Sequence, residues 1–201
     1  MTSPASDPVP AGMYVPTADS RVLMQVDWDG YQSLLALRGE RRRPRLAYLD
    51  GVAELMTTSR DHERIKSRIG DVIRFYCVEL GIPINPFGNW TLSDRSGDAG
   101  AEPDECFIFG ADPETKPRPD LAIEVIWTSG GIDKLEIYRR LGVREVWFWD
   151  DDAISIYVLD VGAYSKRVHS VWLPDLATDV VRRLEQLGTL NEMVAALKAT
   201  L

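Results

Sequence analysis

The amino-acid sequence predicts an α/β (α+β) domain in which a mixed central sheet is flanked by helices. The run at residues 121–127 is apolar on both faces, which is typical of a strand inside a sheet. Residues 65–80 repeat apolar side chains at helical spacing, and helix and strand patterns alternate along the chain. The 201 residues, of which 45% are hydrophobic, are enough to bury the core of one domain.

The N-terminal half begins with a polar segment and then alternates helix and strand patterns. Residues 1–20 have neither the basic nor the apolar region of a signal peptide. They predict a flexible arm, so that residues 21–201 form the single domain. A helix is expected over residues 28–37, followed by two strands joined at Asp50-Gly51, a common hairpin turn pair. The next helix carries the apolar repeat and ends at Gly81.

The C-terminal half contains the central strand and the elements around it. A helix is expected at residues 132–141, ended by Gly142, and a last helix starts near Asp179 and is broken at Gly188. No apolar stretch reaches the roughly 18 residues that a membrane span requires. Strands are expected near residues 105–109 and at residues 121–127, 144–150 and 154–160.

Charge and cysteine content limit the classes of function. The formal net charge of −8 argues against broad coating of nucleic acid, which requires a basic surface. The segment "RGERRRPR" at residues 38–45 is a local basic patch, and it is either a solvated loop or a contact for phosphate. Cys77 and Cys106 have no metal-like spacing and lie in apolar surroundings, which indicates a reduced, cytoplasmic protein.

Glu124 is the most unusual residue of the central strand. Side chains alternate along a strand, so Glu124 shares one face with Ala122 and Ile126. An unpaired carboxylate at such a position costs several kcal/mol. Glu124 therefore requires a cation, a metal ion or a proton beside it.

Lys134 is the expected cation. On a helical wheel for residues 132–141, Lys134 falls on the apolar side with Ile137, Tyr138 and Leu141. It also lies in the first helical turn, where the helix dipole disfavours a positive charge by roughly 0.3–1 kcal/mol. A residue that breaks two local rules often marks function, and we expect Lys134 to face the pocket that holds Glu124.

Asp104 is the third candidate. It follows Pro103 and enters a short strand with buried neighbours. Two carboxylates from neighbouring strands together with a lysine are typical of a site for Mg²⁺ or Mn²⁺, the hard ions that oxygen ligands favour. Such a site hydrolyses phosphodiester bonds by activating water and polarising a phosphoryl oxygen. The alternative is a buried Glu124–Lys134 pair that only holds the helix on the sheet.

His62 leaves three interpretations open. It shares a helical face with Ile65, Ile69 and Tyr76. The side chain caps the start of its helix, packs in the core, or contacts a substrate phosphate.

Several segments together resemble one family. "AYLDGVAELMTTSRDHERI", "GAEPDECFIF" and "RPDLAIEVIWTSGGIDKLEIYRRLGVREVWFWD" are similar to successive blocks of the Uma-two family. These proteins are restriction endonuclease-like members of the PD-(D/E)XK nuclease superfamily, common in bacteria. The resemblance covers about residues 27–190. It implies a metal-dependent nuclease fold with a four-stranded mixed sheet flanked by helices.

The resemblance also implies site residues. Asp104 matches the aspartate of the Pro-Asp motif, Glu124 the glutamate of the central strand, and Lys134 a lysine displaced into the next helix. Glu54 and His62 match positions that are often filled alike in the family.

The sequence departs from the superfamily motif at two places. Ile126 stands where a lysine is usual, so Lys134 must substitute for it in space. A second Pro-Asp occurs at Pro119-Asp120, but Asp120 lies four residues before Glu124 on one strand, about 13 Å away. That distance is too long for one metal ion, and we therefore prefer Asp104.

The resulting hypothesis is a Mg²⁺- or Mn²⁺-dependent DNA endonuclease that acts as a homodimer. Asp104, Glu124 and the carbonyl of Val125 hold the metal, and Lys134 orients the attacking water. Residues 41–43, all arginines, contact phosphate. The rival hypothesis is a binding or interaction module that keeps the nuclease fold without the activity.

Overall fold

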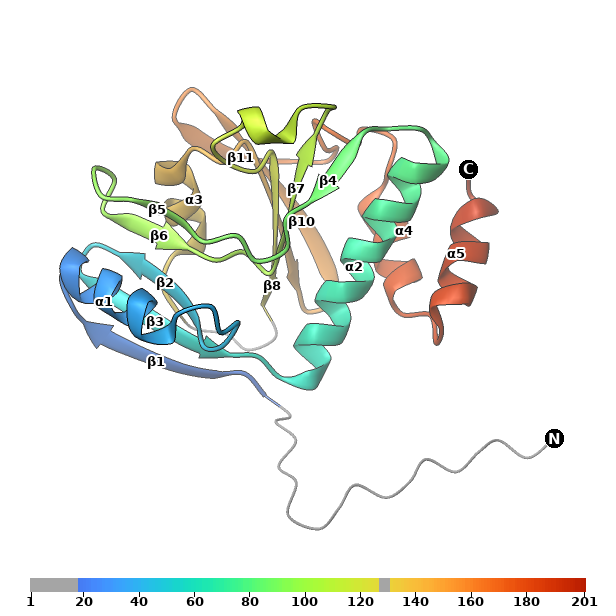
Figure 1. Cartoon of the computed structure of the whole chain (residues 1–201). Coiled ribbons are helices and arrows are strands. Elements are labelled where there is room, and N and C mark those ends of the chain that lie inside the picture. The colour runs from blue at the N-terminus through green and yellow to red at the C-terminus, as the bar shows by residue number, and fades with distance from the viewer. Residues whose placement is uncertain (1–17, 127–130) are drawn as a thin grey trace, which may run out of the picture.

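Two β-sheets and five α-helices make up the part of the chain that the computed structural model describes, residues 18–126 and 131–201 (Figure 1). Residues 1–17 and 127–130, which include Trp127 of the expected central strand, lie outside the described residues. The larger sheet is mixed, because β8 and β9 are parallel and the other neighbours are antiparallel. Its six strands, in spatial order, are β11 (Ala163–Arg167), β10 (Ala153–Asp160), β9 (Glu145–Asp150), β8 (Leu121–Ile126), β7 (Glu105–Phe109) and β4 (Ile84–Pro86).

The smaller sheet is antiparallel throughout. Asp50 and Gly51, both at positive φ, form the two-residue turn between two of its strands, as the sequence predicts. Its five strands, in spatial order, are β1 (Ser20–Gln25), β3 (Val52–Thr57), β2 (Arg45–Leu49), β6 (Ala99–Ala101) and β5 (Leu92–Asp94).

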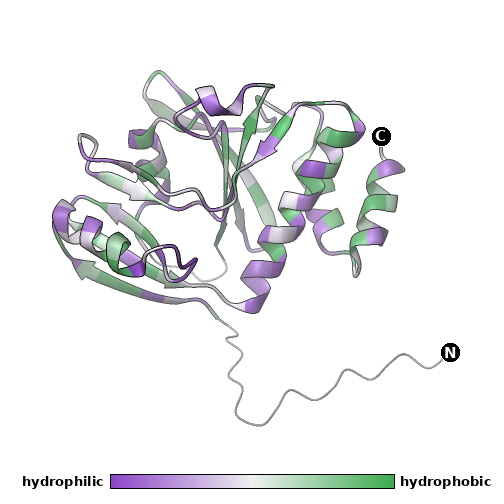
Figure 2. Ribbon diagram, viewed as in Figure 1, coloured by the Kyte–Doolittle hydropathy of each residue, from purple (hydrophilic) through white to green (hydrophobic). Residues whose placement is uncertain are grey.

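The helices cover both faces of the six-stranded sheet. One face packs against α2 (Arg60–Glu79) and α4 (Thr178–Glu185), and α5 (Leu190–Lys198) packs on these two helices. The other packs against α3 (Lys134–Leu141) and small side chains of the five-stranded sheet. The remaining helices are α1 (Trp28–Arg38), which packs on the five-stranded sheet, and the single 3₁₀ turn η1 (Pro113–Thr115). Figure 2 shows hydrophobic residues along the strands and a hydrophilic N-terminal end of α2.

Glu124 is where the sequence predicted it, on an interior strand of the mixed sheet. β8 lies between β7 and β9, and Glu124 is paired in register with Phe148. The side chain lies on the α3 side with Ala122, whereas Ile123 and Val125 face α2. The expected fold class, a mixed sheet flanked by helices, is confirmed.

The sheets contain more strands than the sequence predicted. The family resemblance implied four strands, whereas the mixed sheet has six. Three of the strands that the sequence analysis did not identify have only three residues each, too few for a period of two to emerge. They exist because a neighbouring strand supplies the hydrogen bonds. The unidentified strands are β1, β4, β5, β6 and β11.

The expected flexible arm at residues 1–20 is wrong at its last two residues. Asp19 is buried, and Ser20 begins β1 opposite Thr57. A buried carboxylate with partners holds this end of the segment in place. That residues 21–201 form a single domain stays a prediction. Within the described residues, no helix combines the length and the apolar character that crossing a membrane demands.

Replacing Gly100 with alanine is expected to lower the free energy of unfolding by about 1–3 kcal/mol. An added Cβ would lie 2.4 Å from the hydroxyl oxygen of Tyr31, the fully buried side chain that docks α1 on the sheet. That hydroxyl has no hydrogen-bond partner among the described residues, so Tyr31→Phe alone should not destabilise the protein. Urea unfolding of both single variants and the double variant measures the effect. A Gly100→Ala protein as stable as wild type would contradict the packing argument.

Candidate active site

A cavity of about 340 Å³ lies between the two sheets and the first turn of α3. Glu54 and Met56 of β3 and Arg21 of β1 form the wall on the side of the five-stranded sheet. Glu124 of β8 and Lys134 of α3 lie on the opposite side. The cavity therefore brings together segments that are up to 136 positions apart in the chain, from Arg21 to Tyr157.

Glu124 is almost completely buried in this wall and shares one of its oxygens between two donors. Lys134 Nζ lies 3.4 Å from Glu124 Oε1, and the hydroxyl of Tyr138 donates a short hydrogen bond to the same oxygen. The other oxygen, Oε2, makes no hydrogen bond to a described residue. Burial raises the pKa of Glu124; the Lys134 charge opposes this rise and the nearby Asp104 carboxylate adds to it.

Lys134 reaches Glu124 because of the way α3 begins. The Asp133 side chain accepts a hydrogen bond from Glu136 N at 2.9 Å and caps the helix, so Lys134 is its first residue. Tyr138 follows four residues later, on the same helical face. The expectation that Lys134 faces the pocket holding Glu124 is confirmed.

Asp104 lies directly before β7. Continuing the β7–β8 register by one residue places Asp104 opposite Glu124, which explains why the two carboxylates influence each other. Asp104 Oδ1 contacts both Arg45 and His62, and Asp104 Oδ2 accepts a hydrogen bond from Val125 N at 2.7 Å. Burial by itself raises the pKa of Asp104, but the Arg45 and His62 charges outweigh burial and hold this pKa below its usual range.

Asp104 differs from Glu124 in its access to the cavity. It is not among the lining residues, and it connects to the cavity through Val125, which is one of them. Asp120, the competing aspartate of the second Pro-Asp, lies elsewhere: its Oδ2 binds Lys116 Nζ at 2.6 Å and Phe109 N at 2.8 Å. This geometry supports the preference for Asp104 over Asp120.

His62 is fully buried between two carboxylates. Its Nδ1 lies 2.9 Å from Asp19 Oδ2, and its Nε2 lies 3.0 Å from Asp104 Oδ1. Ionised carboxylates only accept hydrogen bonds, so a carboxylate oxygen beside each ring nitrogen favours the doubly protonated imidazolium. Although burial opposes the charged form, Asp104 and Asp19 raise the pKa of His62 to about 9. Of the three interpretations left open by the sequence, the structure supports a buried residue that contacts Asp104.

Glu54 lines the cavity, and its carboxylate also binds the backbone of the segment that precedes α3. Its Oε2 accepts a hydrogen bond from Ile132 N at 3.2 Å and lies 3.9 Å from Arg21 Nε. The glycine at position 131 leaves the space that the Glu54 carboxylate occupies. It has φ of +116°, and a Cβ there would lie 2.4 Å from Glu54 Oε2.

The site offers few oxygen ligands for Mg²⁺ or Mn²⁺, so water and substrate would have to complete the coordination of the ion. Within residues 18–126 and 131–201, no three His, Cys, Asp or Glu side chains are grouped as metal ligands. Mg²⁺ is usually held by one or two carboxylates together with water and substrate phosphates. Glu124 Oε2 and the unused lone pair of Asp104 Oδ2 supply that number of oxygens, so the residues present fit such an ion.

Sequence reasoning missed four residues of this network. Tyr138 could have been found, because it is one helical turn after Lys134 on the same face. Arg45 is part of the basic patch, for which the sequence allows either a solvated loop or a phosphate contact, yet it is buried, and Arg38 at the other end of the patch pairs with Glu102 at 2.5 Å. Glu63 lies 3.6 Å from Arg45. Asp19 carried no signal in the sequence.

The arrangement is the one expected from the sequence of a restriction endonuclease-like protein: a mixed sheet whose interior strand carries a carboxylate, paired with a lysine of the next helix. The chain belongs to the Uma2 family, whose model, described as "Putative restriction endonuclease", matches residues 28–185. No protein with a curated description matches the chain.

A solved structure is also similar. It is described as a "putative nuclease belonging to DUF820" from Anabaena variabilis, with 14% sequence identity and a TM-score of 0.44. The match covers 81% of this chain and 96% of that chain.

Replacing Gly131 with alanine is expected to destabilise the protein more than the same change at Gly110. Both glycines have a positive φ, +116° and +107°, so both substitutions strain the backbone. Only Gly131 lies against Glu54, whereas a Cβ at Gly110 meets open space. Thermal unfolding should give an excess loss of about 1–3 kcal/mol for Gly131→Ala. Equal losses would contradict the close approach of Glu54.

Stability is expected to fall as pH rises from about 6.5 to above 9, owing to His62. The folded-state pKa of about 9 lies above the ordinary histidine value of 6.5, so the contribution of His62 to stability is complete below pH 6.5 and is lost as the pH passes 9. The contribution is roughly 2–3 kcal/mol. Urea unfolding at pH 6 and pH 9.5 should show a smaller pH-dependent loss for His62→Gln than for wild type. Parallel losses in both proteins would rule out His62 as the source.

Proposed function

We propose that the protein is a metal-dependent nuclease that hydrolyses phosphodiester bonds in DNA, at a site centred on Glu124 and Lys134. The observation that carries this proposal is the state of Glu124. One of its oxygens is bound by Lys134 and Tyr138, and the other has no hydrogen bond to a described residue, in the wall of a cavity. Membership of a family of restriction endonucleases supports the choice of reaction.

Glu124, Asp104 and the backbone carbonyl of Val125 would hold Mg²⁺ or Mn²⁺, because hard ions favour oxygen ligands. When bound, such an ion lowers the pKa of a water molecule and polarises a phosphoryl oxygen. Arg45 and His62 keep Asp104 ionised and fixed in orientation, so that it is ready to act as a ligand.

Lys134 acts on the attacking water. Its ammonium group is fixed against Glu124 and projects into the cavity, where it can donate a hydrogen bond to the water or stabilise the developing negative charge. Tyr138 holds the Glu124 carboxylate toward Lys134. Glu54 keeps the segment before α3 in place and thereby positions Lys134.

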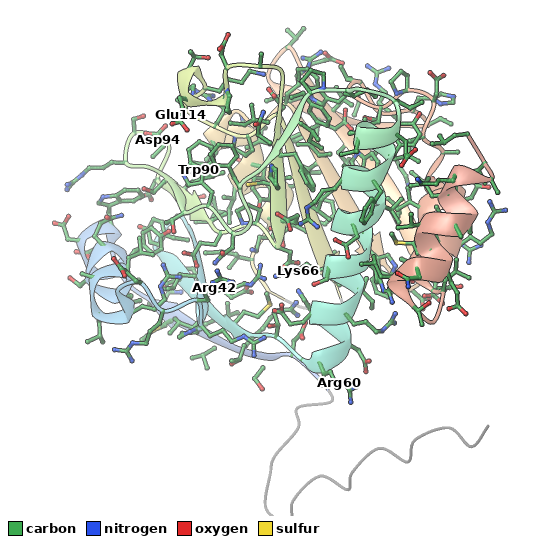
Figure 3. The ribbon with its side chains drawn as sticks, turned by 45° about the vertical axis from the view of Figure 1, so that its right-hand side comes forward. Arg42, Arg60, Lys66, Trp90, Asp94 and Glu114 are labelled. Carbon is green, nitrogen blue, oxygen red and sulfur yellow. The ribbon has the colours of Figure 1, made fainter. Side chains whose placement is uncertain are left out.

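Substrate phosphates beyond the cleaved one would contact the exposed arginines between α1 and β2, Arg41, Arg42 and Arg43. Figure 3 shows Arg42 on this loop. Phosphate contacts of this kind make binding salt-dependent without giving sequence specificity.

We also propose a homodimer, because cutting both strands of a duplex symmetrically requires two sites related by a two-fold axis. A cytoplasmic location is proposed on the two cysteines, which are buried and unpaired.

A second candidate function is a binding or interaction module without catalytic activity. This function is favoured because side chains of the protein already neutralise the buried carboxylates. Asp104 is paired with Arg45 and His62, and Glu124 is paired with Lys134. A metal ion is not needed to neutralise them.

Cleavage of duplex DNA in Mg²⁺ or Mn²⁺ is expected for wild type and should stop in a chelator. Glu124→Gln and Lys134→Ala should each lower the rate at least about 100-fold, because they remove a metal ligand and the group that positions water. Lys116→Ala is the matched control, because Lys116 also pairs with a carboxylate, Asp120, but outside the cavity. Its activity should remain near wild type.

Calorimetry with Mn²⁺ separates the two candidate functions. The nuclease should bind Mn²⁺, Glu124→Gln should lose this binding, and Asp120→Asn should keep it. A wild-type protein that neither binds Mn²⁺ nor cuts DNA would exclude the nuclease and leave the interaction module.

A further inference from the structure

The five-stranded sheet ends in a long, apolar edge. β1 pairs with β3 on one side only and has no strand on its other side among the described residues. Three consecutive side chains at its centre are exposed: Val22 at 57%, Leu23 at 54% and Met24 at 38%. An edge with these properties presents unpaired backbone groups to any other strand, and such edges are normally blocked.

The other three sheet edges in the described part of the chain are blocked in recognised ways. β5 and β4 have only three residues each, and β4 includes Pro86, which cannot donate a backbone hydrogen bond. β11 ends in the exposed pair Lys166 and Arg167. β1 has six residues with neither proline nor lysine. This contrast makes β1 the edge in the described part of the chain that is best suited to pair with another strand.

We propose that β1 pairs antiparallel with β1 of a second copy of this chain, so that the two five-stranded sheets join across a two-fold axis. This inference rests on the proposed homodimer and names its interface. A two-fold axis that relates two neighbouring identical strands makes them antiparallel. If residue i of one copy lies opposite residue j of the other, then residue j of the first copy lies opposite residue i of the second.

The structure fixes which residues face outward. Val26 N donates to Gly51 O at 3.0 Å, which extends the β1–β3 register by one hydrogen-bonded pair. Hydrogen-bonded pairs alternate along antiparallel strands, so Val22 and Met24 direct their backbone groups to β3. Arg21, Leu23 and Gln25 direct theirs to the side of β1 that faces away from β3.

One symmetric register uses all three outward residues. Leu23 lies opposite Leu23 of the second copy, and Arg21 lies opposite Gln25 of the second copy. Each of these pairs exchanges two backbone hydrogen bonds. Other registers around a two-fold axis leave at least one outward residue without a partner inside the strand.

The side chains agree with this register. Val22 of one copy lies beside Met24 of the other on the α1 side, and the two Leu23 side chains meet on the opposite side. Apolar pairs across antiparallel strands contribute roughly 0.2–1 kcal/mol each. Arg21 is the single charged residue of β1, and in this register it faces the neutral Gln25 of the second copy. Although each chain has a net charge of −8, no like charges lie opposite each other in the strand pair.

The interface also places the two active-site cavities on the same side of the joined sheet. Arg21 lines the cavity, and Leu23 shares its face because it is paired with Glu54. Both cavities would then flank the two-fold axis, one from each copy. This is the arrangement that symmetric cleavage of a duplex requires.

Disulfide trapping tests the register directly. In the proposed pair, the two Cα atoms at position 23 are about 5.5 Å apart, within the range that a disulfide bridges. Leu23→Cys should therefore give a covalent dimer on oxidation with oxidised glutathione. Gln25→Cys is the matched control, because its counterpart lies four residues along the strand, about 13 Å away. It should stay monomeric on a non-reducing gel. Native Cys77 and Cys106 are buried.

Sedimentation measures the association itself. Wild type should be a dimer at micromolar concentration, and Val22→Lys combined with Met24→Lys should be a folded monomer, since the two lysines face each other across the axis. Leu37→Lys is the control, because Leu37 is 77% exposed but lies on α1. It should remain a dimer.

The outcomes separate the interface from the wider proposals. A wild-type dimer in which Leu23→Cys does not cross-link, or in which the double lysine variant stays dimeric, would overturn the β1 interface and leave the homodimer standing. A wild type that is monomeric at 100 μM would overturn both. Neither result depends on nuclease activity, which the cleavage assay tests by itself.

Discussion

The structure around the cavity depends on one electrostatic constraint: two carboxylates, Asp104 and Glu124, are buried next to each other. Removing a single charge from water without a partner costs several kcal/mol, and a second like charge nearby increases that penalty. The two groups respond in opposite ways. The pKa of Asp104 is held down by two cations, whereas the pKa of Glu124 is raised by burial.

Each compensating charge comes from a different element, and this ties the fold together. Lys134 brings the first turn of α3 to the mixed sheet, Arg45 brings β2, and His62 brings the start of α2. His62 in turn binds Asp19, so the segment that leads into β1 is connected to the same network. The two sheets are thus joined by charge pairs near the cavity and by apolar packing elsewhere.

The sequence predicted the parts of this structure that leave a local pattern. α2, α3 and the hairpin have clear periodicity and end signals, and Lys134 was identified because it violates the pattern of its helix. The short strands could not be predicted, because β4, β5 and β6 exist through pairing and not through their own sequence. Asp19 and Arg45 could not be assigned either. Their role depends on contacts 43 and 59 residues away in the chain, which no local pattern encodes.

The pairing of Glu124 with Lys134 also bears on how this fold can diverge. Replacing a buried ion pair by apolar residues of similar volume is often neutral or raises stability by about 1–4 kcal/mol, whereas losing one partner alone is strongly destabilising. Single substitutions at either position are therefore selected against on folding grounds, even where no reaction is needed. A joint exchange is not opposed in this way, and it would give a chemically silent form of the same scaffold.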